Sequence, residues 1–291
     1  MMAKTFLFLF IAVPLLALSP TGCTKLVLRS SPELFDHLTQ ALFEECDPGM
    51  AQSAMPAELK ILEGLSKSDP ENSRLLTTLC MGYAGYALLY VEDEDAGRAS
   101  ELYLRSKNFG IRAMGPEARI LDGPAPTLED THRALSQIGA AEVEALLWTA
   151  MAWNSWVRLN LDKPTALAQS ASAQACLDRV LEIQADFFHG VPYILKGATL
   201  AAKPGLLGGD LPGAKACFEQ ALKQTERHFF LAQYYYARYY AVSVQDKALF
   251  LSLLKEVASG APDDLKSVCL INAVMQKKAR KLMARAEDLF I

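Results

Sequence analysis

The spacing of apolar residues is the feature that most restricts what this chain can fold into. Apolar side chains recur at three- and four-residue intervals over most of its 291 residues. This period is typical of amphipathic helices, and only Lys25–Arg29 is expected as a short extended piece. Proline and glycine interrupt the pattern often, which predicts helices of about 10–20 residues between the breaks. The clearest breaks are Asp47–Gly49, Asp69–Pro70, Met114–Pro116, Gly123–Pro126, Asp162–Pro164, Lys203–Gly205, Leu211–Gly213 and Gly260–Pro262.

Two segments also carry the signature of a helix start. Ser68–Glu71 and Thr127–Asp130 each combine a capping oxygen with early acidic residues. Such residues satisfy the free N–H groups of a first helical turn, so we expect a helix to begin at each segment.

A loose internal repeat indicates that these helices stack as hairpins. Ala214, Phe218 and Ala221 form a small–aromatic–small triplet, and related triplets occur earlier in the chain at 41- or 74-residue spacing. A pair of helices needs about 34–45 residues, so this period suits stacked hairpins. The pattern resembles the tetratricopeptide repeat, and it predicts an all-α fold, a tetratricopeptide-like α-solenoid, with residues 31–291 as one helical domain. The earlier triplets are Ala173/Leu177/Val180, Ala99/Tyr103/Ser106 and Glu58/Leu62/Leu65.

The N-terminus is expected to be a targeting segment. Lys4 precedes an apolar run over residues 5–18, which is the plan of a secretory signal peptide over residues 1–22. Gly22-Cys23 resembles the lipobox of bacterial lipoproteins, in which Cys23 would carry the lipid and residues 23–30 would form the tether. Pro20 departs from that motif, and an ordinary signal peptide with a coincidental cysteine is the alternative. Thr24 favours the outer membrane by resemblance to Gram-negative sorting.

Composition excludes several classes of protein. Hydrophobic residues make up 51% of the chain and charged residues 21%, which argues against general disorder. The net charge of −4 argues against a generic nucleic-acid binder. Five cysteines remain besides Cys23, and their wide spacing suggests no disulfide scaffold. Four of them lie in apolar helical patterns and are expected to be buried as small hydrophobic residues: Cys80, Cys176, Cys217 and Cys269.

No catalytic or metal-binding constellation is recognisable in the sequence. The four histidines are scattered, at positions 37, 132, 189 and 228, and none has a zinc-ligand spacing. The glycines of residues 205–209 form neither a P-loop nor a dinucleotide fingerprint. We therefore expect no enzyme activity, no cofactor and no metal.

Two aromatic groups and one basic stripe have both a structural and a functional interpretation. Trp148, Trp153 and Trp156 share one predicted helix, where they either line an apolar ligand site or pack in the core. Five tyrosines between residues 234 and 240 surround another helix, so some rings must reach a surface or a cavity. The basic residues of the last helix, between Lys277 and Arg285, suit either a solvated face or contact with anionic lipid.

The order of several stretches is similar to one family, the T-component lipoproteins associated with TRAP transporters. The resembling stretches are 55–65, 69–72, the Trp-rich helix 146–159, Leu206–Asp210 running into residues 214–222, 250–254 and 287–290. This resemblance implies a non-enzymatic periplasmic lipoprotein with cryptic tetratricopeptide repeats. Its partner would be the periplasmic solute-binding protein of a TRAP importer. The resemblance also implies a homotrimer. It further implies a cleft for a small organic solute, often an apolar carboxylate.

The resemblance also suggests where the cleft lies. The loop of Leu206, Leu207, Gly208, Gly209 and Asp210 would lie near it, and the helix from Trp148 to Trp156 would help to line it. The two glycines would serve equally well to end one helix and turn into the next.

Two other functions are compatible with the sequence. A lipidated adaptor for envelope assembly could hold an extended protein segment in the groove of its repeats. A helical enzyme acting on an envelope substrate could use Glu142 and Glu144 beside the Trp-rich helix.

Overall fold

The computed structural model describes residues 20–31, 33–123, 126–203 and 205–290, and it places helix after helix along them. No strand occurs within these ranges. The predicted all-α fold of packed helices is therefore confirmed, whereas the tetratricopeptide assignment stays a prediction. Residues 1–19 of the expected signal peptide (residues 1–22) lie outside the described ranges. The backbone of Cys23 belongs to the first helix, but its side chain is not among those described.

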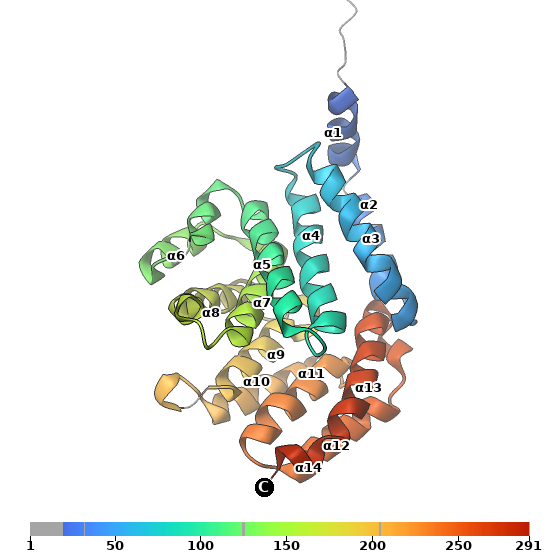
Figure 1. Cartoon of the computed structure of the whole chain (residues 1–291), viewed down its shortest axis with the longest axis vertical. Coiled ribbons are helices and arrows are strands. Elements are labelled where there is room, and N and C mark those ends of the chain that lie inside the picture. The colour runs from blue at the N-terminus through green and yellow to red at the C-terminus, as the bar shows by residue number, and fades with distance from the viewer. Residues whose placement is uncertain (1–19, 32, 124–125, 204, 291) are drawn as a thin grey trace, which may run out of the picture.

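The first part of the chain forms five helices and one π-helical turn (Figure 1). They are α1 (Pro20–Ser30), α2 (Glu33–Phe43), α3 (Pro48–Ser66), α4 (Ser73–Tyr86), its π-helical continuation η1 (Ala87–Val91) and α5 (Ala96–Ala113). The middle of the chain holds η2 (Pro116–Asp122), α6 (Leu128–Leu135), η3 (Ala140–Glu142), α7 (Val143–Leu159), α8 (Pro164–Gln184), α9 (Phe187–Ala201), η4 (Gly205–Leu207) and α10 (Leu211–Gln224). The last part holds α11 (Phe230–Tyr235), the π-helix η5 (Tyr236–Ala241), α12 (Lys247–Ser259), η6 (Pro262–Val268), α13 (Cys269–Met283) and α14 (Ala286–Leu289).

The helices pack as successive hairpins. The pairs α4/α5, α7/α8, α9/α10 and α12/α13 are each in close contact, and α5 also packs on α7. The triplet of Ala214, Phe218 and Ala221 is fully buried on α10. The ring of Phe218 lies against Gly197 of α9, where a Cβ atom would be 2.9 Å from the ring. The small-residue positions thus let a neighbouring helix approach, as the repeat predicts.

Two local expectations were wrong. Lys25–Arg29 is helical, because Lys25 and Arg29 occupy one face of α1 and both reach the buried carboxylate of Asp69. The side chain of Asp69 is engaged in these ion pairs and does not cap a helix. Ser68–Glu71 therefore does not start a helix, and α4 begins at Ser73, with Asn72 as its cap. The other predicted start is confirmed, since Thr127 caps α6.

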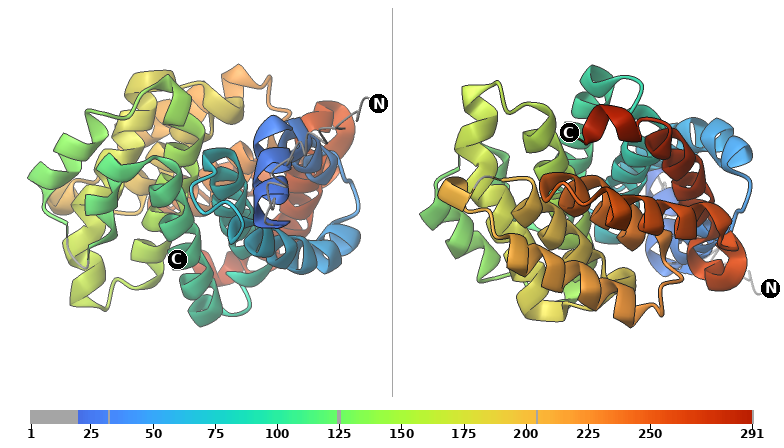
Figure 2. Two further views of the ribbon diagram at one scale, coloured as in Figure 1. Left: turned by 90° about the horizontal axis from the view of Figure 1, so that it is seen from above. Right: turned by 90° about the horizontal axis from the view of Figure 1, so that it is seen from below.

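The two ends of the described chain meet. Helix α13 contacts both α2 and α3, and Figure 2 shows the N-terminal helices in blue beside the C-terminal ones in red. A disulfide between Cys46 and Cys269 joins them across 223 residues. The expectation that Cys269 is a free, buried thiol was therefore wrong, because the fold brings it beside the loop between α2 and α3. The remaining described cysteines, Cys80, Cys176 and Cys217, are free.

Candidate functional site

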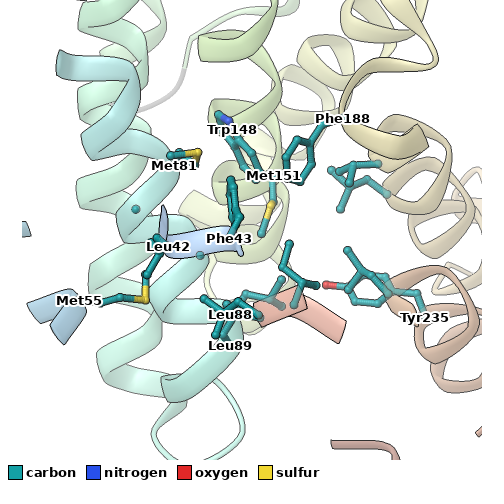
Figure 3. Close-up of a pocket in the computed structure, with 17 residues that line it drawn as sticks. Leu42, Phe43, Met55, Met81, Leu88, Leu89, Trp148, Met151, Phe188 and Tyr235 are labelled. Atoms are coloured by element: carbon teal, nitrogen blue, oxygen red, sulfur yellow. The ribbon is translucent and has the colours of Figure 1, made fainter. Parts of the chain in front are cut away.

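An apolar cavity lies where the beginning, middle and end of the chain converge (Figure 3). Its volume, counted as the space open to the centre of a water molecule, is about 40 Å³. We call it the apolar cavity. Its walls are Leu42, Phe43, Met55, Met81, Gly82, Gly85, Leu88, Leu89, Trp148, Met151, Phe188, Val191, Leu195, Leu231, Tyr235, Leu270 and Ile271. A hydrocarbon group is the kind of occupant that such walls favour.

Three methionines and one glycine give this cavity its shape. Met55, Met81 and Met151 contribute flexible thioether side chains that adapt to differently shaped groups. Gly85 lies in the last turn of α4 with no atom within 4 Å of its missing Cβ, so the space beside it belongs to the cavity.

An aromatic cluster centred on Phe188 closes one side of the cavity. The ring of Phe188 lies 5.2 Å from those of Phe43 and Trp148 and 6.4 Å from that of Phe229. Three different segments of the chain thus meet on one side chain. Edge-on and tilted ring contacts of this kind add to the stabilisation that burial provides.

The backbone that carries Phe188 is left-handed over three consecutive residues. Phe188, His189 and Gly190 have φ values of 44°, 58° and 77°. A left-handed residue other than glycine costs on the order of 1–3 kcal/mol and persists only where its surroundings enforce it. Here Gln224 of α10 donates a hydrogen bond to the carbonyl of Asp186, just before the turn. The turn directs Phe188 into the cluster, and strain of this kind concentrates at functional sites.

His189 is packed in the same turn. Its ring lies 5.7 Å from that of Phe229, and its Nε2 atom is 3.2 Å from Oγ of Ser267. Burial lowers the pKa of His189, which favours the neutral imidazole.

A second, more polar cavity continues from the apolar one and shares Met151, Leu195 and Tyr235 with it. We call it the polar mouth. It measures about 110 Å³ by the same measure, and its polar side chains include Asn154, Ser155, Arg158, Ser170, Gln174, Thr199, Lys203 and Tyr239. The two cavities together offer apolar walls at one end and cationic groups at the other. This arrangement suits a molecule with an apolar part and an anionic group.

The two cations of the polar mouth differ in how they are held. Arg158 pairs with the buried carboxylate of Glu92 at 2.7 Å. Lys203 makes no ion pair within the described part of the chain. Burial, together with the nearby Lys196, lowers the pKa of Lys203. Lys203 is therefore the cation that a ligand anion can neutralise without breaking an existing pair.

A buried charge network lies behind the polar mouth, at the junction of the two π-helices. Glu92 follows η1 and accepts a hydrogen bond from Tyr103 at 2.6 Å. Arg238 of η5 lies 3.2 Å from Asp93 and 3.9 Å from Glu92, and Asp93 also pairs with Lys278 of α13. Lys278 is buried, so the basic stripe of the last helix is not wholly a solvated face. The network fixes Arg158 at the wall of the mouth.

The structure separates the three predicted tryptophans. Trp148 lines the apolar cavity. Trp153 is fully buried, donates a hydrogen bond to Gln169 at 2.9 Å and lies beneath the ammonium of Lys107 at 4.2 Å. Trp156 is also buried, and neither it nor Trp153 lines the joined cavities.

The predicted loop lies on the surface beyond Lys203. Leu206 is fully exposed, Gly208 has a φ of +86°, and Gly209 is half-buried. Asp210 caps α10 by accepting a hydrogen bond from the N–H of Gly213 at 3.0 Å. Leu207 belongs to η4, but its side chain is not described. The loop therefore turns the chain from α9 into α10 and adds no described side chain to the cavities.

Several lining residues were not identified from the sequence. Phe188, Tyr235 and Met151 come from separate helices, and nothing in their local sequence marks them as neighbours. The tyrosine-rich stretch was the sequence signal that pointed to a cavity, since five rings around one helix cannot all pack in the core. Tyr234, Tyr235 and Tyr236 are buried, and Tyr239 and Tyr240 are half-buried.

The two glutamates considered for an enzyme have structural partners. Glu142 accepts a hydrogen bond from the N–H of Gly139, and Glu144 pairs with Arg74. Among the described residues, no group of three or more His, Cys, Asp or Glu side chains could hold a metal ion. No helix in the described ranges is long and apolar enough to cross a membrane.

Comparison with known proteins finds a matching family model and a similar bacterial protein. A family model described as TRAP transporter T-component matches residues 44–290. A protein of Treponema pallidum (strain Nichols), described as uncharacterized, is 24% identical over an alignment 284 residues long, and the alignment covers 89% of this chain and 87% of the relative. The family match includes every residue of the two joined cavities except Leu42 and Phe43.

Proposed function

The chain belongs to the TRAP transporter T-component family, and from this premise we propose that it is a lipid-anchored periplasmic accessory protein that docks the solute-binding protein of a TRAP importer and holds a small organic solute. The observation that carries the solute-binding part is the pair of joined cavities. Their apolar walls and the ammonium of Lys203, which has no ion-pair partner among the described residues, suit an apolar organic anion.

Two independent features support the proposed location. The apolar N-terminal run and Cys23 favour export and lipidation, which would tether α1 to a membrane. The disulfide between Cys46 and Cys269 is a bond that persists in oxidising compartments such as the periplasm.

The docking face is proposed to surround the polar mouth. Leu161 lines the mouth and is half exposed, and Leu206 is fully exposed three residues beyond Lys203. Exposed leucines around a cationic opening suit a protein partner that covers the opening while a solute passes between them. A homotrimer is part of the same proposal and is checked by light scattering of the purified protein.

The test is affinity purification of the full-length protein from its native envelope, with mass spectrometry of co-purifying proteins. Recovery of a periplasmic solute-binding protein together with TRAP membrane subunits is expected. Leu206→Asp should reduce that recovery, while Ile61→Asp, at an equally apolar exposed position on α3, should not. Recovery of envelope-assembly proteins without a solute-binding protein would contradict the proposal and favour the adaptor function.

A further inference from the structure

Tyr235 places a polar atom inside the apolar cavity. The residue is 5% exposed, and it lies at the boundary that the apolar cavity shares with the polar mouth. Figure 3 shows its hydroxyl oxygen directed into the cavity, toward the aliphatic side chains there. The nitrogen of Trp148, by contrast, lies on the side of its ring away from Tyr235.

No described residue gives the Tyr235 hydroxyl a hydrogen bond. Other buried tyrosines of the same region have partners: Tyr103 donates to Glu92 at 2.6 Å, and Tyr234 accepts from Arg238 at 3.1 Å. The sealed polar side-chain atoms without a partner in the described ranges are Oη of Tyr90, Nε1 of Trp148, Oε1 of Gln224 and Oε1 of Gln233, so the Tyr235 hydroxyl is instead open to the cavity. An occupant that fills the cavity without offering an acceptor would seal this hydroxyl without a partner, which is unfavourable. The Tyr235 hydroxyl is therefore a donor that an occupant of the cavity can reach.

The hydroxyl is held in place and stays protonated. Tyr235 is the last residue of α11, directly before η5, and its ring packs 5.1 Å from Tyr239 and 6.2 Å from Tyr234. Burial raises the pKa of Tyr235 far above its ordinary value, and the proximity of Tyr239 and Glu92 adds to this. The group can therefore donate a hydrogen bond from a fixed position.

We propose that the solute of the joined cavities carries a hydrogen-bond acceptor, such as a carbonyl, ester or ether oxygen, within its apolar part, and that Tyr235 recognises this acceptor. The inference rests on the proposed function in that the cavities hold a solute. It adds that a plain hydrocarbon chain is not the preferred occupant, because such a chain would leave the hydroxyl unpaired.

A matched pair of probes tests this recognition. 2-Heptanone and 2-methyl-1-heptene have nearly the same shape, but only the ketone has an acceptor. Binding of each is measured with the purified full-length protein in lipid nanodiscs by tryptophan fluorescence, because Trp148 lines the cavity. The informative quantity is the ketone-to-alkene affinity ratio, since solvation of the free probes cancels when the wild type and a variant are compared.

In Tyr235→Phe this ratio should fall about five- to tenfold, which corresponds to one neutral hydrogen bond. Tyr240→Phe is the matched control, because that half-buried ring lines neither of the joined cavities, and it should keep the wild-type ratio. An unchanged ratio in Tyr235→Phe, an equal fall in both variants, or no binding of either probe to the wild type would overturn the proposal. Loss of solute-binding protein from the affinity purification, with the probe result intact, would instead contradict only the docking function.

Discussion

At the scale of single residues, the left-handed turn shows how one backbone conformation positions an aromatic side chain. Phe188 reaches the cluster with Phe43, Trp148 and Phe229 because the chain turns against the usual helical hand at residues 188–190. Glycine at the third of these positions lowers the strain of the turn, since it has no Cβ.

Replacing that glycine tests the turn. In Gly190→Ala the new Cβ would lie 2.5 Å from Oε1 of Gln224. The alanine would also have to adopt the left-handed backbone conformation of this position, which is unfavourable for a residue with a Cβ. We expect the free energy of unfolding to fall by about 1–3 kcal/mol in urea titrations followed by circular dichroism. Gly64→Ala is the control, because that glycine is in α3 with open space around it, and it should stabilise by about 0.5–1 kcal/mol. Equal effects of the two changes would argue against a strained turn.

Single residues also show why the site was only partly predictable from sequence. The Trp-rich helix is where we expected it, but its three indoles could not be assigned to core or cavity from spacing alone. Trp153 is in the core because Gln169 and Lys107, from two other helices, provide its polar contacts. Those partners are distant in sequence, so the difference between Trp148 and Trp153 arises only in the packed fold.

At the scale of helices, α4 provides both a packing face and an opening. Gly82 lies against Leu59, where a Cβ would be 2.6 Å from a side-chain carbon, whereas Gly85, almost one turn later, faces the apolar cavity. One glycine therefore allows α3 to approach, and the other leaves room for a ligand.

Filling the second of these positions should close the cavity. Gly85→Leu adds a side chain in the space beside α4, so probe binding should weaken at least tenfold while the protein stays folded, because leucine is also a better helix former than glycine. Fluorescence titration with 2-heptanone and a thermal unfolding curve measure the two effects. Gly64→Leu, on the open side of α3, should leave binding unchanged. Full binding by Gly85→Leu would show that the probe occupies a different place.

The two π-helices bring charged side chains together at one junction, and this has a pH signature. Burial opposes ionisation of Asp93, but Lys278 and Arg238 outweigh it and lower the pKa of the carboxyl group. A carboxyl with a lower pKa in the folded state stabilises the fold above its unfolded pKa of about 3.9, and this stabilisation is lost as pH falls through the folded value.

Asp93→Asn should therefore be less stable than the wild type at pH 7, and the difference should shrink as the pH falls below about 4. Urea unfolding at a series of pH values between 7 and 3 measures the difference. The same loss at every pH would mean that the substitution acts through packing and not through the charge.

At the scale of the whole molecule, the sequence predicts the helical class well and the closure of the fold poorly. Helical periodicity, the Pro and Gly breaks and the small–aromatic–small triplets are local signals, and they predicted hairpins that the structure contains. The contact of α13 with α2 and α3 depends on how all the hairpins pack on one another. No local sequence pattern encodes this long-range arrangement, so the pairing of Cys46 with Cys269 was not predicted.

The same closure builds the apolar cavity, because the disulfide joins two of its walls. Cys46 follows the cavity residues Leu42 and Phe43 by a few positions, and Cys269 directly precedes Leu270 and Ile271. A cross-link over 223 residues restricts the unfolded chain strongly, and removing such a bond typically costs about 2–5 kcal/mol.

We therefore expect the double substitution Cys46→Ser/Cys269→Ser to lower the free energy of unfolding by about 2–5 kcal/mol. It should also weaken probe binding, because α2 and α13 can then separate at the cavity wall. Urea unfolding and the 2-heptanone titration measure both effects. Wild-type protein treated with a reductant should behave like the double variant, and Cys217→Ser, which removes a free thiol, should behave like the untreated wild type. If stability fell but binding did not, the cavity walls would be held by helix packing alone, and the disulfide would act only on the unfolded chain.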